Sequence, residues 1–265
     1  MMEPVVAARP EIGNVVCDLD GVVYLLGEPV PGAGQALTEL HEAGYTIVFV
    51  TNNSTRSPAD TAVRIDELTG YPARDHQVIG SAQAAVTMLT ANAGPVMVLG
   101  GNGIRQALVA AGIPETDDPG AAEALIVGLD TGISYERLCD AVMAVRSGAR
   151  FIATNTDPTY PTPDGLWPGA GAIVAAIQVA SGVEPEIAGK PHAAIRSLIR
   201  ARLAPGPVWV VGDRPETDLA MAKAEGWASV LVLSGVVHDA DQIPEKYRPD
   251  LILPSLADLP VALQS

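Results

Sequence analysis

The chain has 265 residues and a formal net charge of −15, because 31 acidic residues outweigh 16 basic ones. Proteins that bind nucleic acid or membrane surfaces normally display a basic patch, so this acidity argues against both kinds of partner. Hydrophobic residues make up 48% of the chain but aromatic residues only 4%, which predicts an aliphatic core in one large domain or two modest ones.

Targeting signals and cysteines indicate the expected compartment. The sequence contains no run of about 18 apolar residues, as a membrane span requires. The first residues, Met1-Met2-Glu3-Pro4, lack the basic flank and apolar stretch of a secretory signal. Cys17 and Cys139 are too far apart in sequence to indicate a disulfide framework or a metal cluster. We therefore expect a cytoplasmic protein.

Short apolar runs alternate with helix-like stretches along the whole chain. In chain order, the runs that we predict as strands are 15–17, 46–50, 96–99, 125–127, 151–153, 208–211, 230–233 and 251–253. The predicted helices are 34–43, 59–68, 104–111, 135–147, 173–180, 193–203 and 218–225. Glycines that are typical of helix C-termini stand at 44, 112, 148, 182 and 226. Because the strand runs are continuously apolar and alternate with helices, they predict an α/β fold with buried parallel sheets.

Polar residues follow three of these predicted strands. The first strand leads into Asp18-Leu19-Asp20-Gly21, the second into Thr51-Asn52-Asn53-Ser54, and a later one into Gly212-Asp213, with Asp218 shortly beyond. In open parallel sheets, ligands bind in the crevice beyond the carboxyl ends of the strands. The three segments are therefore expected to meet at one site.

Asp18 and Asp20 carry the first candidate chemistry. Two residues apart on an extended backbone, their side chains point the same way. They could simply close the strand as an Asx-turn. However, adjacent carboxylates repel one another unless a cation or a shared proton relieves them. Because Asp213 and Asp218 follow another strand, a Mg²⁺ site, which prefers oxygen ligands, is the better interpretation.

Thr51, Asn52 and Lys190 are candidates for anion binding. The segment at Thr51 could be no more than a helix N-cap, with Ser57-Pro58 beginning the next helix. A hydroxyl followed by consecutive backbone N–H groups also forms an anion cradle. Lys190 could be a solvated surface lysine, but its position between Gly189 and Pro191, just before a helix in which Pro191 is expected at the first position, favours an anion contact.

The glycine-rich segment 99–103 resembles a dinucleotide-binding loop. It lacks the last glycine of that pattern and a suitably placed acidic partner, so it is interpreted as a tight turn between a strand and a helix.

Four segments together resemble the haloacid dehalogenase superfamily, whose motifs occur in the same order. They are Asp18-Leu19-Asp20-Gly21-Val22, Thr51-Asn52-Asn53-Ser54, Gly189-Lys190-Pro191 and 212–218. The chain is most similar to the NagD-type phosphatases of that superfamily, through Ala153-Thr154-Asn155-Thr156-Asp157-Pro158, Pro168-Gly169-Ala170-Gly171-Ala172 and the segment 232–236. The resemblance covers nearly the whole chain.

The resemblance implies a Rossmann-like parallel-sheet core with an inserted α/β cap domain. Residues 1–82 and 185–265 are expected to form the core, and residues 83–184 the cap. The implied function is Mg²⁺-dependent hydrolysis of small phosphomonoester metabolites through an aspartyl-phosphate. Glycerol phosphate, phosphoglycolate, sugar phosphates and nucleotide monophosphates all remain open as substrates.

The resemblance also implies a role for each motif residue. Asp18 is the expected nucleophile and Asp20 the general acid and base. The expected metal ligands are Asp18, the backbone carbonyl of Asp20 and Asp213, with Asp218 acting through metal-bound waters. Thr51, the Asn52 backbone N–H and Lys190 are expected to bind phosphate. The expected substrate contacts from the cap lie near Asn155, Asp157 and Arg105.

Three other functions could be carried by the same fold. A hydrolytic dehalogenase needs neither a metal nor an acid two residues after the nucleophile, so Asp20 and Asp213 argue against it. A phosphotransferase, which passes the phosphoryl group to another alcohol, remains open. A sensor without catalysis is disfavoured because all four motifs are intact. Members of this family commonly form homodimers through the cap, but no feature of this sequence decides that point.

Overall fold

The computed structural model describes residues 12–89, 93–162 and 164–264. The first four residues, for which the sequence predicts no secretory signal, lie outside this part of the chain. Within it, no helix combines the length and the apolar character needed to cross a membrane.

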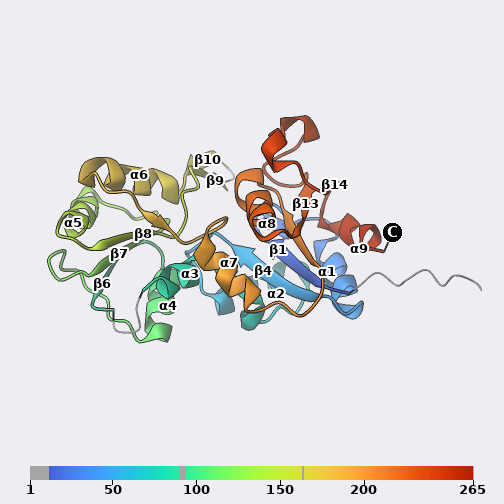
Figure 1. The fold of residues 1–265 in the computed structure, drawn as a ribbon, viewed down its shortest axis with the longest axis horizontal. Coiled ribbons are helices and arrows are strands. Elements are labelled where there is room, and N and C mark those ends of the chain that lie inside the picture. Colours follow the sequence, from blue (N-terminus) through green and yellow to red (C-terminus); the bar gives the residue numbers. More distant parts are fainter. Residues whose placement is uncertain (1–11, 90–92, 163, 265) are drawn as a thin grey trace, which may run out of the picture.

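Two parallel sheets lie side by side along the longest axis of the molecule (Figure 1). The first has six strands in the order β14-β13-β12-β1-β4-β5. The strands span Asn14–Asp18 (β1), Thr46–Thr51 (β4), Val78–Gly80 (β5), Val208–Gly212 (β12), Ala228–Val232 (β13) and Leu251–Leu253 (β14). In the central strand β1, Cys17 is paired with Phe49 of β4 and with Val211 of β12. The predicted α/β class is confirmed.

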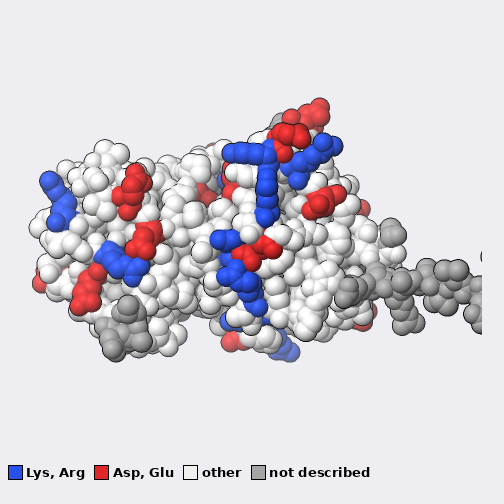
Figure 2. All heavy atoms as spheres, in the orientation of Figure 1, with Lys and Arg blue, Asp and Glu red and all other residues white. Residues whose placement is uncertain are grey.

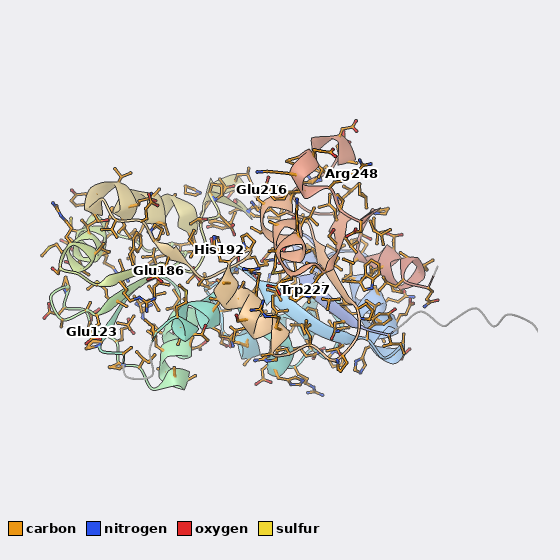
Figure 3. The ribbon with its side chains drawn as sticks, viewed as in Figure 1. Glu123, Glu186, His192, Glu216, Trp227 and Arg248 are labelled. Carbon is orange, nitrogen blue, oxygen red and sulfur yellow. The ribbon has the colours of Figure 1, made fainter. Side chains whose placement is uncertain are left out.

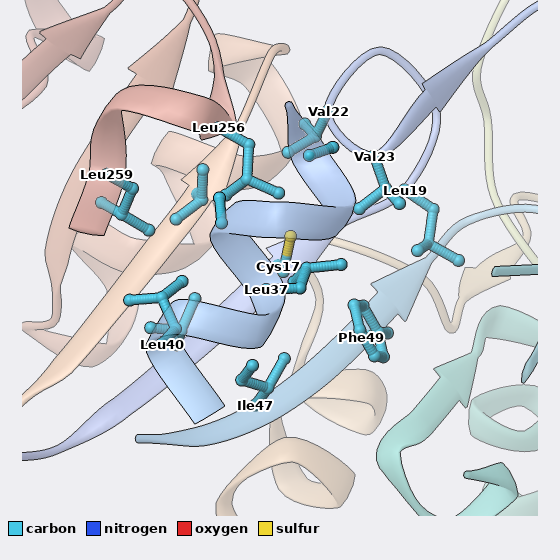
Figure 4. Close-up of a cluster of buried hydrophobic side chains, with 14 of the residues drawn as sticks. Cys17, Leu19, Val22, Val23, Leu37, Leu40, Ile47, Phe49, Leu256 and Leu259 are labelled. Carbon is cyan, nitrogen blue, oxygen red and sulfur yellow. The ribbon is translucent and has the colours of Figure 1, made fainter. Parts of the chain in front are cut away.

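Apolar side chains bury both faces of the first sheet. On one face, Cys17 and Phe49 pack against Leu37 and Leu40 in a cluster of fully buried side chains (Figure 4). The helices on this side are α1 (Ala33–Glu42), α2 (Pro58–Thr69) and α9 (Leu259–Ala262). The other face packs against α3 (Ser81–Thr87), α7 (Ala193–Arg200) and α8 (Ala220–Glu225). Strand residues alternate between these two layers, as the pleat requires.

The second sheet has four parallel strands in the order β11-β8-β7-β6. They span Val96–Leu99 (β6), Ala124–Val127 (β7), Arg150–Ala153 (β8) and Glu186–Ile187 (β11). Around them lie α4 (Asn102–Ala111), α5 (Tyr135–Arg146), α6 (Ala170–Ser181) and the hairpin of β9 (Thr159–Thr162) with β10 (Gly165–Pro168). β11 begins two residues beyond the expected end of the insertion at 184.

Apolar contacts join the two sheets. One buried cluster contains Val50 and Ile79 of the first sheet together with Val98 and Ile126 of the second. Figure 3 labels Glu186 on the second-sheet side, Trp227 on the first-sheet side and His192 between them. The insertion is therefore attached to the first sheet through packed side chains as well as through its two connecting segments.

All eight predicted strands are present, with ends within about two residues of the prediction. Positive φ angles at glycines 44, 112, 148, 182 and 226 confirm the predicted helix ends. Segment 99–103 is the expected turn between β6 and α4. The short elements that were not predicted are β2 (Tyr24–Leu25), β3 (Glu28–Pro29), β5, α3, β9, β10, β11, α9 and 3₁₀ turns at Asp75–Gln77, Ala240–Gln242, Glu245–Tyr247 and Leu256–Asp258.

Two helix predictions were wrong in detail. The expected helix 218–225 is split into a π-helical turn, Pro215–Leu219, followed by α8. Asp218 therefore lies inside a tight turn instead of opening a helix. Pro191 was expected at the first position of a helix, but α7 begins at Ala193 with His192 as its N-cap residue.

Charged side chains of both signs are intermingled on the face shown in Figure 2. Ion pairs such as Arg150–Glu186, at 2.8 Å, join some of them. Acidic and basic side chains are thus mixed on that face, where salt screens exposed charges within about 8 Å.

Candidate active site

Three neighbouring strands deliver the predicted motifs to one edge of the first sheet. Asp18 ends β1, Thr51 ends β4 and Asp213 follows directly after β12. Because β12, β1 and β4 are adjacent and parallel, their carboxyl ends lie together. The predicted convergence is confirmed. The residues border a pocket of about 260 Å³, which is also lined by residues from the insertion.

Lys190 lies at the base of this site, between two carboxylates. Its Nζ atom is 2.6 Å from Oδ1 of Asp18 and 2.7 Å from Oδ1 of Asp218. Burial by itself lowers the pKa of Lys190, but the two carboxylates raise it more, so the ammonium form is retained. Only 4% of Lys190 is exposed, so the solvated-lysine interpretation is wrong.

Asp18, Asp213 and Asp218 each place a carboxylate oxygen within 4.8 Å of the others. Burial raises the pKa of Asp18 well above its usual value; Asp218 raises it further, whereas Lys190 opposes the rise. Burial, together with the charge of Asp218, raises the pKa of Asp213 to about 6. Such a cluster is costly without a cation, because the carboxylates repel one another in a medium of low polarity.

The backbone around Asp213 is shaped to hold its carboxylate. Oδ2 of Asp213 accepts a hydrogen bond from the Val236 N–H at 2.7 Å. A Cβ atom at Gly235 would lie 2.0 Å from that oxygen, and one at Gly21 would lie 2.3 Å from it. Glycine is required at both positions for this close approach. An oriented set of carboxylate oxygens of this kind fits Mg²⁺, which prefers hard oxygen ligands.

Asp20 occupies a different place from the acidic cluster. It lies at the mouth of the pocket, where its side chain is exposed to solvent. The surrounding walls nevertheless limit its hydration and raise its pKa, whereas Lys190 and three arginines oppose the rise. A carboxyl group of raised pKa at the mouth of a pocket can donate as well as accept a proton.

Asn52 connects the first sheet to the insertion. Its carbonyl oxygen accepts hydrogen bonds from Asn155 Nδ2 and from Ser81 Oγ, both at 2.7 Å. Its side-chain Oδ1 accepts from the Lys190 N–H at 2.8 Å, and its Nδ2 lies 3.3 Å from Oδ2 of Asp157. The Thr51 hydroxyl accepts from the Asn53 N–H at 3.0 Å, which shapes the turn. Asn155 and Asp157 thus hold this loop as well as lining the pocket.

Sequence reasoning missed three arginines. Arg56, Arg64 and Arg214 all line the pocket. Arg214 lies inside the quoted segment 212–218 and Arg56 lies two residues after Ser54, and these positions could have flagged both arginines. Arg64 lies on α2 and carries no sequence signal. The expected cap arginine, Arg105, instead pairs with Glu115 at 2.9 Å and donates to the Gly100 carbonyl.

Known protein families and individual proteins match large parts of this chain. A family model described as haloacid dehalogenase-like hydrolase matches residues 15–114, and an HAD-hydrolase-like model matches residues 187–259. A D-glycerol 3-phosphate phosphatase from Mycobacterium tuberculosis is 37% identical over 226 residues, which are 84% of this chain and 63% of that relative. An acid sugar phosphatase from Staphylococcus haemolyticus is 35% identical over 88% of this chain and 92% of its own length.

A solved structure shares the fold over most of the chain. The crystal structure of a glycerol phosphate phosphatase from Mycobacterium tuberculosis in complex with magnesium has a TM-score of 0.83 and 35% identity, covering 93% of this chain and 75% of that one. The chain therefore belongs to the haloacid dehalogenase-like hydrolases, within their NagD-type phosphatases.

Proposed function

We propose that this protein is a Mg²⁺-dependent phosphatase that hydrolyses small phosphomonoesters through an aspartyl-phosphate. The observation that carries the proposal is the buried Lys190 ammonium between Asp18 and Asp218, at the base of a pocket that Asp20 borders. The phosphatase names of the relatives support it.

Asp18 is the proposed nucleophile. Its side chain lines the pocket and is 11% exposed, and its Oδ1 atom is held by Lys190. Attack on phosphorus by an Asp18 oxygen forms an acyl phosphate and releases the substrate alkoxide. A carboxylate nucleophile divides one difficult hydrolysis into two easier steps.

Asp20 is the proposed general acid and base. With its raised pKa, it is able to carry the proton that the leaving alkoxide takes. The resulting carboxylate then accepts a proton from the water that attacks the acyl phosphate. That second attack frees Asp18 and inorganic phosphate and returns Asp20 to its starting state.

Asp18, the backbone carbonyl of Asp20, and Asp213 are proposed to hold Mg²⁺, with Asp218 supporting it. When bound, Mg²⁺ neutralises charge on the phosphoryl oxygens, which otherwise repel the Asp18 carboxylate. The Thr51 hydroxyl, the Asn52 N–H and the Lys190 ammonium are proposed to bind the remaining oxygens, where negative charge develops in the transition state.

Several further expectations stand as parts of this proposal. Residues 1–82 and 185–265 form the catalytic core and residues 83–184 a cap, supported by the second sheet and its helices. A cytoplasmic location is supported by the free thiols of Cys17 and Cys139. The proposal also includes a homodimer that forms through the cap. Neither nucleic acid nor a membrane is an expected partner. A phosphotransferase on the same site remains the second candidate.

Release of inorganic phosphate from a panel of phosphorylated metabolites tests the function. We expect Asp18→Asn to abolish release, while the exposed Asp66→Asn on α2 serves as a matched control. Excess EDTA is expected to stop turnover, and added Mg²⁺ to restore it. Turnover by Asp18→Asn would refute the nucleophile, and a phosphorylated product formed from excess acceptor alcohol would favour the phosphotransferase.

A further inference from the structure

Three guanidinium groups line the pocket. Arg56 follows β4, Arg64 lies on α2 and Arg214 follows β12, so three separate segments bring them together. The charges of all three act on Asp20. In a chain with only 16 basic residues, three arginines on one small pocket are a marked local excess of positive charge.

These arginines lack the acidic partners that other arginines have. Arg105, Arg137 and Arg150 each pair with a carboxylate. Within the described residues, no ion pair forms at Arg56, Arg64 or Arg214, although Asp60 acts weakly on Arg56 from the exposed face of α2.

Arg64 is the least satisfied of the three. Its Nε atom is buried without a hydrogen-bond partner in the described structure. Its guanidinium group lies 5.3 Å from the ring centroid of Tyr24, which holds it over the aromatic face. A buried donor without a partner costs free energy that a ligand oxygen could recover.

The carboxylates near the pocket are engaged elsewhere. Asp18 is paired with Lys190, Asp213 accepts from the Val236 N–H, and Asp157 lies against Asn52. The charges of all three arginines act on Asp20, and that of Arg214 also acts on Asp213. Since Asp20 is proposed to protonate the leaving oxygen, these cations lie where the leaving group of a substrate would lie.

We propose that the arginines Arg56, Arg64 and Arg214 form a subsite for a second oxyanion carried by the leaving group of the substrate. This inference rests on the proposed phosphatase function and narrows its substrate class. Guanidinium groups match carboxylate and phosphate oxygens with paired hydrogen bonds. Preferred substrates are small phosphomonoesters that carry a carboxylate or a second phosphate, instead of neutral polyol phosphates.

Three probes built on one carbon frame test the subsite. Glycerol 3-phosphate has a neutral leaving group, 3-phosphoglycerate replaces its hydroxymethyl by a carboxylate, and glycerol 1,3-bisphosphate carries a second phosphate. We expect kcat/KM to be about tenfold or more higher for at least one anionic probe, as hydrogen bonds to charged groups typically provide. The two anionic probes distinguish carboxylate from phosphate recognition.

Arginine variants then locate the preference. Arg64→Gln is expected to lower the ratio of kcat/KM for the preferred anionic probe to that for glycerol 3-phosphate about tenfold. Arg56→Gln, at an exposed position, serves as a second variant that folding should tolerate. Arg146→Gln, exposed on α5, removes the same charge far from the pocket and should leave the ratio unchanged.

Each result decides the proposal. Equal kcat/KM for all three probes, or equal losses on all of them in Arg64→Gln and Arg56→Gln, would overturn the subsite while leaving the phosphatase intact. If none of the three probes is hydrolysed, the wider panel of phosphorylated metabolites decides the phosphatase proposal. Calorimetric binding then decides the subsite: tighter binding of an anionic probe than of glycerol 3-phosphate supports it, and equal binding overturns it.

Discussion

Asn155 of the insertion donates a hydrogen bond from Nδ2 to the backbone carbonyl oxygen of Asn52, at 2.7 Å. Asn155 is 5% exposed and Asn52 is 8% exposed, so water does not readily replace this bond. The same Asn52 accepts the Lys190 N–H on its side chain. One short path therefore runs from the insertion to the lysine at the base of the site.

The first prediction concerns that path. Asn155→Ala leaves the Asn52 carbonyl with one donor fewer, and such a loss costs about 1–3 kcal/mol. We expect kcat to fall about tenfold with a smaller change in KM, because the loop that positions Lys190 loses its support. The kcat of Asn155→Asp, a variant that keeps the shape of the side chain without the amide donor, should fall equally. Steady-state kinetics of both variants check this, and a kcat within twofold of wild type would contradict it.

The second prediction concerns the start of α2. Ser57 accepts the Asp60 N–H on its hydroxyl at 3.1 Å and donates to the Asp60 carboxylate at 2.7 Å. Ser57→Ala is expected to lower the free energy of unfolding by about 1 kcal/mol, the usual cost of losing an N-cap. Urea unfolding measures it. Ser147→Ala, at the exposed C-cap of α5, is the control and should change stability by less than half as much.

The sequence predicted the strands and their functional ends because both depend on local patterns. Continuous apolar runs such as 46–50 require burial on both faces, which only the interior of a parallel sheet offers. Once Asp18, Thr51 and Asp213 are placed at strand ends, their convergence follows from topology. The short strand β11 and the hairpin strand β9, whose residues include Pro161, carry no such pattern.

Contacts between distant segments could not be predicted from the sequence. Lys190 was predicted to contact an anion, but its two ion pairs depend on how β1 and the turn containing Asp218 approach it. Arg64 is one of several charged residues along α2, and only the folded helix turns it toward Tyr24. Such pairings arise from tertiary packing, which composition and periodicity do not record.

The third prediction concerns Lys190 as a structural group. Removing one member of a buried ion pair leaves an uncompensated charge, which typically costs about 3–5 kcal/mol. Lys190→Met should therefore lower the free energy of unfolding of the metal-free protein by that order, and less at acid pH, where Asp18, whose pKa is raised, takes up a proton. Lys223→Met, at an exposed position of α8, is the control. Urea unfolding at two pH values tests this, and an unchanged midpoint would contradict the pairing.

The last prediction concerns Mg²⁺ and pH. In the metal-free protein the pKa of Asp213 is raised to about 6, so its protonated form is stabilised by folding. That contribution is complete below the ordinary carboxyl pKa and is lost as pH rises through about 6. Mg²⁺ binds only the carboxylate, so its affinity should weaken about tenfold per pH unit below 6, and the raised pKa of Asp18 acts in the same direction.

Thermal unfolding with increasing Mg²⁺ measures this affinity at about pH 5, 6 and 7. We expect the stabilisation to be small at the lowest pH and largest at the highest. Asp213→Asn has no proton to release and lacks a full ligand charge, so its response should be weak and should vary less with pH than that of the wild-type protein, because only the raised pKa of Asp18 remains. Equal stabilisation of the wild-type protein at all three pH values would contradict Asp213 as a ligand that must deprotonate to bind.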